Sequence, residues 1–239
     1  MSLRRPVEQR RSRCEGYGPG VAALGSGVRL PFADRADAGR RLGDRLAALL
    51  DLQDPAGVVV LGLPRGGVVV AAEVARRLGA PLDAFIVRKL GVPGQPELAM
   101  GAIATGGVVV RNDAVIEARG LGPDAVAAVV ATEQAELERR EREYRGDRPP
   151  LDAAGRLAIV VDDGLATGAT ARAALRAVRD QHPARLILAV PVAPRDAAVG
   201  DADQLVALAR PWPFGAVGRH YRDFSATTDD EVRTLLGTS

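Results

Sequence analysis

Residues 157–170 have the sequence Leu-Ala-Ile-Val-Val-Asp-Asp-Gly-Leu-Ala-Thr-Gly-Ala-Thr. The apolar run at its start is rich in β-branched residues and is typical of a buried parallel strand. Two adjacent carboxylates, Asp162 and Asp163, end that run. A turn of small and hydroxyl-bearing residues follows, and residues 171–181 then have a helical pattern. The stretch therefore predicts a strand, an acidic pair, a tight loop and a helix, in this order.

The loop between the acidic pair and the helix has the features of an anion site. Unpaired N–H groups and the helix dipole favour negative charge at a helix N-terminus. The carboxylates come one step earlier, where the hydroxyls of a sugar attached to a bound phosphate would lie. An isolated Asp-Asp-Gly is more often an ordinary turn, with Thr167 or Thr170 as an N-cap. The fixed spacing of Thr-Gly-Ala-Thr favours instead a site for a phosphorylated sugar.

Alternating strand and helix patterns predict an α/β fold with a parallel sheet flanked by helices. Residues 91–107 are rich in Gly and Pro and predict a long loop or a mobile hairpin. Asn112 and Thr228 are expected to cap helices. The expected helices are 34–50, 68–78, a short one after Asn112, 123–145, 171–181 and 229–236, and the expected strands are 57–61, 84–87, 107–111, 157–161, 185–190 and 204–209.

Charged residues follow three of the expected strands. Arg65 lies in the turn after strand 57–61, Lys89 comes directly after strand 84–87, and the acidic pair follows strand 157–161. In parallel sheets, ligands bind beyond the carboxyl ends of the strands. We therefore expect Arg65, Lys89 and the acidic pair to form one site.

Composition excludes several kinds of site. The only cysteine is Cys14 and the only histidines are His182 and His220, so an intramolecular disulfide and a Cys- or His-rich metal site are excluded. A reducing cytoplasm is the expected location. The sequence contains neither a G-x-x-x-x-G-K-[ST] loop nor a G-x-S-x-G elbow, which argues against a P-loop NTPase and an α/β-hydrolase.

The basic pI of 9.1 comes from the N-terminal end of the chain. Residues 1–15 hold five Arg and two Glu, a net charge of +3, whereas the whole chain has +2, which leaves −1 for the rest. Residues 1–28 are expected to be a disordered basic tail, and residues 29–239 to be the folded domain. The near-neutral domain argues against a nucleic-acid partner, and the absence of a long apolar run argues against a membrane span.

The acidic pair and its loop closely resemble the signature of type I phosphoribosyltransferases, which bind phosphoribosyl pyrophosphate (PRPP). The resemblance implies an open Rossmann-like sheet with a small C-terminal hood. It implies that Asp162 and Asp163 face the ribose, and that the 5′-phosphate is held by Ala166, Thr167, Gly168, Ala169 and Thr170. The turn at Arg65, Gly66 and Gly67 resembles the family's pyrophosphate loop.

A second stretch, Arg88-Lys89-Leu90-Gly91, resembles the Arg-Lys-x-Gly stretch of adenine phosphoribosyltransferases. This resemblance adds Arg88 and Lys89 to the pyrophosphate-binding set and makes residues 91–107 the mobile catalytic loop. Lys89 is also the only lysine among 32 basic residues, which favours a specific need for an ammonium there, although chance is the alternative. Leu165-Ala166-Thr167-Gly168 has Ala where hypoxanthine-guanine enzymes have a purine-contacting Asp, which weakly favours an adenine-like base.

Residues from about 205 to 239 resemble the C-terminal part of a poorly characterised branch of this family and are expected to form the hood. Trp212, Phe214, Tyr221 and Phe224 are four of the eight aromatic residues of the chain. Trp212, Phe214 and Tyr221 are candidates for stacking a base, and closing a second small core is the alternative use of these rings.

The resemblance implies a Mg²⁺-dependent enzyme that transfers the phosphoribosyl group from PRPP to a nitrogenous base and releases pyrophosphate. Mg²⁺ would be held mainly by PRPP, with Asp162 and Asp163 nearby. Asp162, Asp163, Lys89 and Arg65 are the candidate catalytic residues. A regulator that senses PRPP or a nucleotide with the same pocket is the alternative, and a PRPP synthetase-like protein lacks an evident ATP site. The acceptor base stays open, as does a homodimer.

Overall fold

The structure, a computed structural model, describes residues 28–50, 54–198 and 200–238. The expected basic tail lies outside these ranges apart from Val28, which packs against the core together with Leu30. In the described part of the chain, no helix combines the length and the apolar character needed to cross a membrane.

The body of the molecule is a parallel five-stranded sheet with the order β2-β1-β6-β7-β8. Each neighbouring pair is parallel, as the alternation of strands and helices predicts. The α/β fold class is therefore confirmed. The strands are β1 (Val58–Gly62), β2 (Leu82–Ala84), β6 (Leu157–Val161), β7 (Arg185–Val192) and β8 (Gln204–Ala209).

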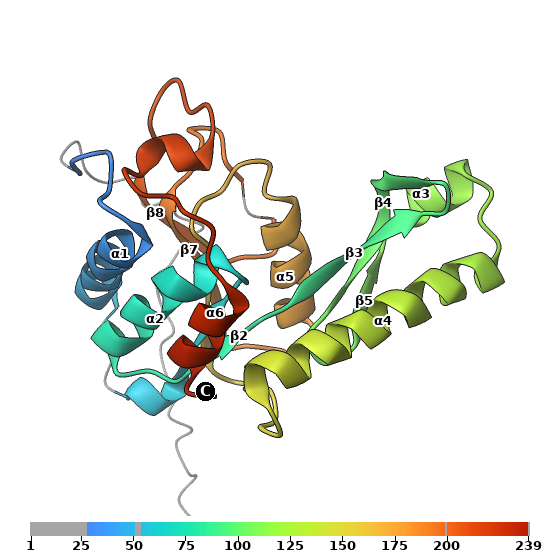
Figure 1. Ribbon diagram of the computed structural model, residues 1–239, viewed down its shortest axis with the longest axis horizontal. Coiled ribbons are helices and arrows are strands. Elements are labelled where there is room, and N and C mark those ends of the chain that lie inside the picture. Colours follow the sequence, from blue (N-terminus) through green and yellow to red (C-terminus); the bar gives the residue numbers. More distant parts are fainter. Residues whose placement is uncertain (1–27, 51–53, 199, 239) are drawn as a thin grey trace, which may run out of the picture.

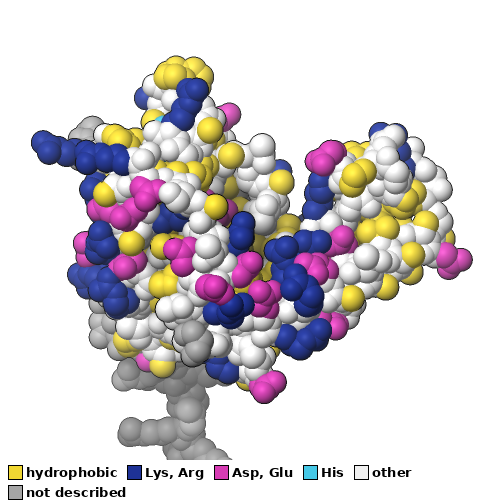
Figure 2. Space-filling model, viewed as in Figure 1, with side chains coloured by type: hydrophobic (Ala, Val, Ile, Leu, Met, Phe, Trp, Pro, Cys, Tyr) yellow, Lys and Arg dark blue, Asp and Glu magenta, His cyan; other side chains and the backbone are white. Residues whose placement is uncertain are grey.

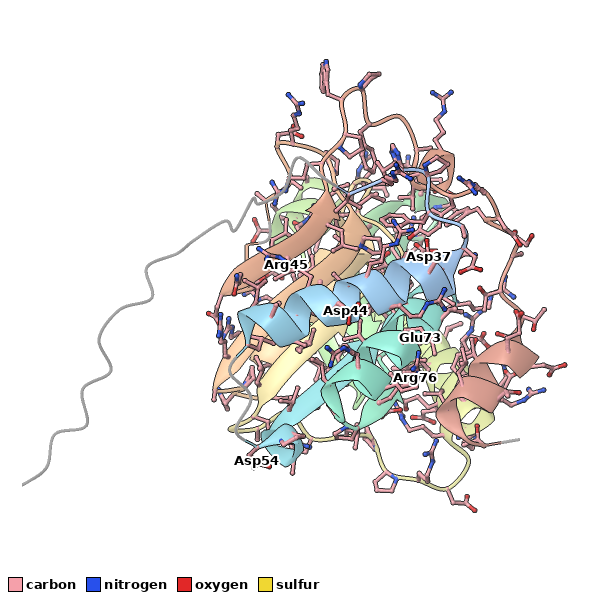
Figure 3. The ribbon with its side chains drawn as sticks, turned by 90° about the vertical axis from the view of Figure 1, so that its left-hand side faces the viewer. Asp37, Asp44, Arg45, Asp54, Glu73 and Arg76 are labelled. Carbon is pink, nitrogen blue, oxygen red and sulfur yellow. The ribbon has the colours of Figure 1, made fainter. Side chains whose placement is uncertain are left out.

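Helices cover both faces of this sheet. On one face lie α1 (Arg35–Leu49), which Asp34 caps, and α2 (Gly66–Leu78), and on the other lies α5 (Ala169–Arg179). Successive residues of β1 serve different layers, because Val60 packs with α1 and α2 whereas Val59 and Leu61 pack with α5. Figure 3 shows α1 and α2 side by side across the first face. An added Cβ at Gly39 of α1 would lie 2.8 Å from the Val70 carbonyl oxygen, so this close packing needs glycine.

A second unit, here called the arm, projects from the body (Figure 1). It consists of a three-stranded antiparallel sheet in the order β3-β4-β5, with α3 and α4 beside it. Asn112 caps α3 and α4 has its predicted bounds. The arm elements are β3 (Val87–Val92), β4 (Gln95–Ala104), β5 (Val108–Arg111), α3 (Asp113–Ala118) and α4 (Pro123–Arg145).

The arm corrects two predictions. The strand expected at 84–87 is wrong, because the chain leaves the parallel sheet after Ala84 and begins β3 at Val87. Ile86 N–H donates to Thr105 Oγ1 rather than to a parallel neighbour. The long loop at 91–107 is wrong too, and the hairpin is right, because β4 fills most of that segment and pairs with β3. An apolar run does not reveal which strand its backbone pairs with, so a single strand was predicted where the chain leaves one sheet and enters another.

The base of the arm is held by a buried ion pair. Arg145, which is 4% exposed, donates from Nε to Asp83 Oδ2 at 2.8 Å and from Nη2 to the Ala84 carbonyl oxygen at 2.8 Å. Asp83 also accepts from the Leu151 N–H. The second half of α4 is nearly all charged in sequence, which predicts a solvated surface, but its last two residues, Tyr144 and Arg145, are buried along with Leu137. The charge run in the sequence conceals this anchor.

The C-terminal region divides into two parts. The strand β8 belongs to the main sheet, so residues 205–209 of the segment expected to form a hood are part of the body instead. Residues 210–227, here called the cap, include the short 3-10 helix Val217–His220, and Tyr221 of the cap forms a β-bridge with Phe32. The last helix, α6 (Asp229–Leu236), starts with a capping box at Thr228 and packs against α2 and α4 instead of joining the cap.

We expect Arg145→Met to lower the free energy of unfolding by about 3–5 kcal/mol, because it leaves the Asp83 carboxylate buried without its cation. Urea unfolding followed by circular dichroism measures this. Replacing the exposed Arg139 with Gln on the same helix should change the unfolding midpoint little, and Asp83→Leu combined with Arg145→Met should recover part of the loss. Equal effects at positions 139 and 145 would contradict the anchor.

Candidate functional site

The site lies where two adjacent strands of the main sheet end. Strands β1 and β6 pair in parallel with Gly62 opposite Val161, and the Leu63 N–H donates to the Val161 carbonyl oxygen at 2.9 Å. After α2 the chain continues to β2 on one side of β1, whereas β6, β7 and β8 follow on the other side. The order of the sheet therefore reverses between β1 and β6, which is where open α/β sheets form binding crevices.

The acidic pair follows β6 directly, as predicted, and its two carboxylates have different surroundings. Asp162 Oδ1 accepts from the Asp163 N–H at 2.9 Å. Asp163 Oδ2 accepts from Arg35 Nε at 2.8 Å, and the side chain of Asp163 is 18% exposed. The Tyr221 hydroxyl donates to the backbone carbonyl oxygen of Asp163 at 2.5 Å. Asp163 is thus fixed from both its side chain and its backbone.

Burial and charge shift the protonation of this pair. Burial, and then the negative charge of Asp163, raise the pKa of Asp162 well above the ordinary aspartate value, while Arg35 opposes the shift. Burial, followed by the charge of Asp163, also raises the pKa of Tyr221. A ligand that brings hydroxyl donors or a cation to Asp162 would offset the cost of its charged form.

Two glycines at the start of α2 let the turn after β1 approach the acidic pair. An added Cβ at Gly66 would overlap Asp163 Oδ2, and one at Gly67 would lie 2.9 Å from the Cα of Asp162. Both contacts are closer than real Cβ atoms allow. The predicted convergence of this turn with the acidic pair is therefore present, and the Pro64–Arg65 peptide bond in the turn is cis.

The loop after the acidic pair surrounds a small cavity. Gly168 precedes α5 with a φ of 71°, in the left-handed region that favours glycine. The Leu165 N–H donates to the Val192 carbonyl oxygen at 2.9 Å, and Arg172 Nη1 donates to the Thr167 carbonyl oxygen at 2.7 Å, so both sides of the loop are held. The cavity is about 140 Å³ and is lined by Asp162 and by residues 164–171. The first N–H groups of α5 lack acceptors within the helix and are available to an anion.

The Arg65 side chain does not point to the acidic pair. Its Nη1 lies 3.8 Å from Asp229 Oδ2 at the start of α6, and its side chain is 48% exposed. Asp229 also accepts a short hydrogen bond from the Tyr144 hydroxyl. The sequence placed Arg65 correctly in the turn but could not reveal this partner, which comes from the C-terminal helix.

Arg88 and Lys89 lie on opposite faces of β3, because successive residues of a strand alternate. Arg88 Nη2 lies 2.6 Å from Glu133 Oε2 of α4, on the side away from α5. Lys89 Nζ lies 3.6 Å from Glu97 Oε2 and lines a cleft of about 450 Å³ between the arm and α5, with Ala169 and Thr170 on its other wall. The structure therefore brings Lys89 near the loop that follows the acidic pair, whereas Arg88 faces α4. Figure 2 shows basic and acidic side chains side by side where the arm meets the body.

The aromatic residues of the cap differ in how far they are buried. Tyr221 is 6% exposed, and its ring lies 5.5 Å from Phe32 and 5.0 Å from Phe224 between centroids, so it is part of the core. Phe214 packs against His220 at 5.2 Å. Trp212 is 77% exposed. Of the three candidates for stacking a base, Trp212 is the one with a free ring surface in this structure, and their role stays a prediction.

Among the described residues, no group of three or more His, Cys, Asp or Glu side chains could hold a metal ion by itself. The two carboxylates at the end of β6 fit an ion that takes its other ligands from a phosphorylated substrate and water, as Mg²⁺ commonly does. Arg35 was not predicted from the sequence, although it places a positive charge beside the Asp163 carboxylate. Its sequence position, one Arg among many at the start of a helix, carries no signal of this contact.

Comparisons with known proteins agree with this geometry. Residues 36–206 match the family described as the phosphoribosyl transferase domain. The chain is 51% identical over 208 residues to a protein of two Mycobacterium tuberculosis strains, CDC 1551 / Oshkosh and H37Rv, which carries a provisional phosphoribosyl transferase name. This match covers 86% of the chain and 46% of the relative, so the chain spans about half the length of these curated relatives. A crystal structure from Thermus thermophilus is similar with a TM-score of 0.75 and 43% identity, covering 87% of this chain and 98% of that one.

We expect Asp162→Asn to raise the melting temperature by about 2–4 °C at pH 9 and by less at pH 5. When folding raises the pKa of a carboxyl, the protein loses stability as the pH rises from the pKa in the unfolded chain to the pKa in the folded one. Above that range the folded state must hold a buried charge. Asn never carries that charge. Calorimetric scans across this pH range measure the difference, and an identical pH profile for the two proteins would contradict it.

Proposed function

The chain belongs to the phosphoribosyl transferase domain family, and from this premise we propose that it transfers the 5-phosphoribosyl group of PRPP to a nitrogenous base and releases pyrophosphate. The observation that carries the proposal is the acidic pair, which lies between two glycine-containing turns at the ends of adjacent strands. One turn offers backbone donors for a phosphate, and the other approaches the pair closely enough to hold a second anionic group.

The proposed placement of PRPP follows the order of these segments. The 5′-phosphate occupies the cavity formed by residues 164–171, and the ribose hydroxyls donate to Asp162 and Asp163. The pyrophosphate lies at the turn that holds Gly66 and Gly67. Arg65 reaches it by exchanging its 3.8 Å contact with Asp229 for the incoming anion. This exchange is favourable because a solvent-exposed ion pair contributes little to stability.

In the proposed reaction, the C1′–oxygen bond to pyrophosphate breaks as a ring nitrogen of the base forms a bond to C1′, and the proton of that nitrogen passes to pyrophosphate or to solvent. The positive charge that develops on the ribose ring is stabilised by the carboxylates of Asp162 and Asp163. Arg65 and Lys89 stabilise the negative charge that develops on pyrophosphate. Residues 91–107, within the arm hairpin, exclude water, since hydrolysis of PRPP is the competing reaction.

We further propose that the reaction depends on Mg²⁺. The ion would be held mainly by the oxygens of PRPP, with the carboxylates of Asp162 and Asp163 nearby at the end of β6. Bound there, Mg²⁺ neutralises charge on the leaving group. Mg²⁺ beside Asp162 would oppose the burial that raises the pKa of this carboxyl, because a nearby cation favours the ionised carboxylate. A nucleobase-like molecule is the proposed acceptor. The proposed location is the cytoplasm, which a chain with Cys14 as its single cysteine suits.

For the acceptor, we propose an adenine-like base over a 6-oxopurine. Ala166, at the tip of the phosphate-type loop, has no side chain that could hydrogen-bond an exocyclic group. A site that hydrogen-bonds one such group can reject the analogue by several orders of magnitude, so a competition experiment should be decisive. The cap contacts the acidic pair through the Tyr221 hydroxyl, which donates to the Asp163 carbonyl oxygen, and Trp212 is its exposed aromatic ring.

The test is pyrophosphate release from PRPP and Mg²⁺ with adenine, hypoxanthine, guanine, uracil and orotate in competition. We expect turnover, with adenine preferred. Asp162→Asn combined with Asp163→Asn should abolish turnover and weaken PRPP binding by calorimetry at least tenfold, because two charged hydrogen-bond acceptors are lost. Unchanged PRPP binding in this double variant would reject the site. Tight PRPP binding without turnover of any base would favour a regulator.

Lys89→Arg should lower kcat roughly tenfold while changing the affinity for PRPP less. An ammonium can follow a phosphate oxygen as the bond breaks, whereas a planar guanidinium needs a fixed geometry. Arg88→Lys is the matched control, because this neighbour faces α4 and pairs with Glu133. Steady-state kinetics separate the two effects, and wild-type kinetics in Lys89→Arg would show that the single lysine has no specific role.

A further inference from the structure

Arg35 makes three separate contacts with its guanidinium group. Its Nε donates to Asp163 Oδ2 at 2.8 Å, and its Nη1 donates to the backbone carbonyl oxygen of Ser225 at 2.7 Å. Its Cζ lies 3.9 Å from the ring centroid of Phe224, within the range of a cation–π contact. The side chain is only 12% exposed although Arg35 is the first residue of α1.

The same group also borders the turn after β1. An added Cβ at Gly66 would lie 2.6 Å from Arg35 Nε and would overlap Asp163 Oδ2, so the backbone of this turn packs directly against the ion pair. One side chain therefore touches the acidic pair, the turn proposed for pyrophosphate and the C-terminal segment that leads to α6. Of these contacts, the one to Asp163 involves a carboxylate that is proposed to bind the ribose.

The position of Arg35 on the Asp163 carboxylate affects how that carboxylate can bind a ligand. Arg35 occupies one oxygen of Asp163, and the Tyr221 hydroxyl fixes the backbone of the same residue. Arg35 thus binds Oδ2 of Asp163 and leaves the other carboxylate oxygen for a ligand.

We propose that Arg35 is a positioning residue, which orients the Asp163 carboxylate toward the ribose hydroxyls and ties the segment 223–225 to it. This inference rests on the proposed function of the acidic pair. Recognition of ribose depends on this geometry, whereas recognition of phosphate by the loop after Asp163 does not.

The test compares Arg35→Gln with Arg41→Gln, a matched control on the same helix. Arg41 also pairs with an aspartate, Asp37 at 2.9 Å, and its Cζ lies 5.4 Å from the Phe32 ring, but it does not contact the site. Binding of ribose 5-phosphate, of PRPP with Mg²⁺ and of inorganic phosphate is measured by calorimetry, with melting temperatures recorded for each variant.

For Arg35→Gln, we expect a loss of about tenfold in affinity for ribose 5-phosphate and PRPP, and little change for inorganic phosphate. Arg41→Gln should bind all three as the wild type does. Wild-type affinity of Arg35→Gln for ribose 5-phosphate, or an equal loss for phosphate, would overturn the inference. If the wild type itself binds neither PRPP nor ribose 5-phosphate, the proposed function fails as well.

Arg35→Lys is the second variant if Arg35→Gln unfolds at a much lower temperature. It keeps a cation beside Asp163 but lacks the planar fork that reaches Asp163 and Ser225 together. It should also lose affinity for ribose 5-phosphate with phosphate binding unchanged, and wild-type affinity in this variant would overturn the inference.

Discussion

The close approach of the turn after β1 to the end of β6 is the constraint on which the site depends. Gly66 and Gly67 leave no room for side chains, so α2 can start directly against Asp162 and Asp163. This packing places the N-termini of two helices, α2 and α5, on either side of two carboxylates. A helix N-terminus attracts anions, whereas a carboxylate repels them and accepts hydrogen bonds from hydroxyls. Together they suit a ligand that has both hydroxyls and phosphates, such as a phosphorylated sugar.

The parts of this arrangement that depend on local signals were predictable. The bounds of α4 and β6 follow from apolar periodicity, a proline at the first helical turn and the abrupt change from Val161 to Asp162. The convergence of the turn at Arg65 with the acidic pair follows from the rule that parallel strands end at one edge. These features need no knowledge of distant partners.

The remaining features depend on contacts between residues far apart in sequence. The Arg35 and Asp163 pair spans 128 positions, and the Arg145 and Asp83 pair spans 62. The sequence contains so many arginines that none of them signals its partner. The change from a parallel to an antiparallel sheet after Ala84 was missed for the same reason, because it is decided by Thr105 and by the strand β4 that carries the chain back.

The single tryptophan has a consequence for optical measurements. Trp212 is already 77% exposed in the cap, whereas the cores of the body and the arm contain no tryptophan. Its emission in the folded protein should therefore resemble that of an indole in water, and unfolding should shift the wavelength little. A ring or chain segment that covers Trp212 would move the emission to shorter wavelength. Intrinsic fluorescence is consequently a poor indicator of global unfolding in this molecule and a selective indicator of what happens at the cap.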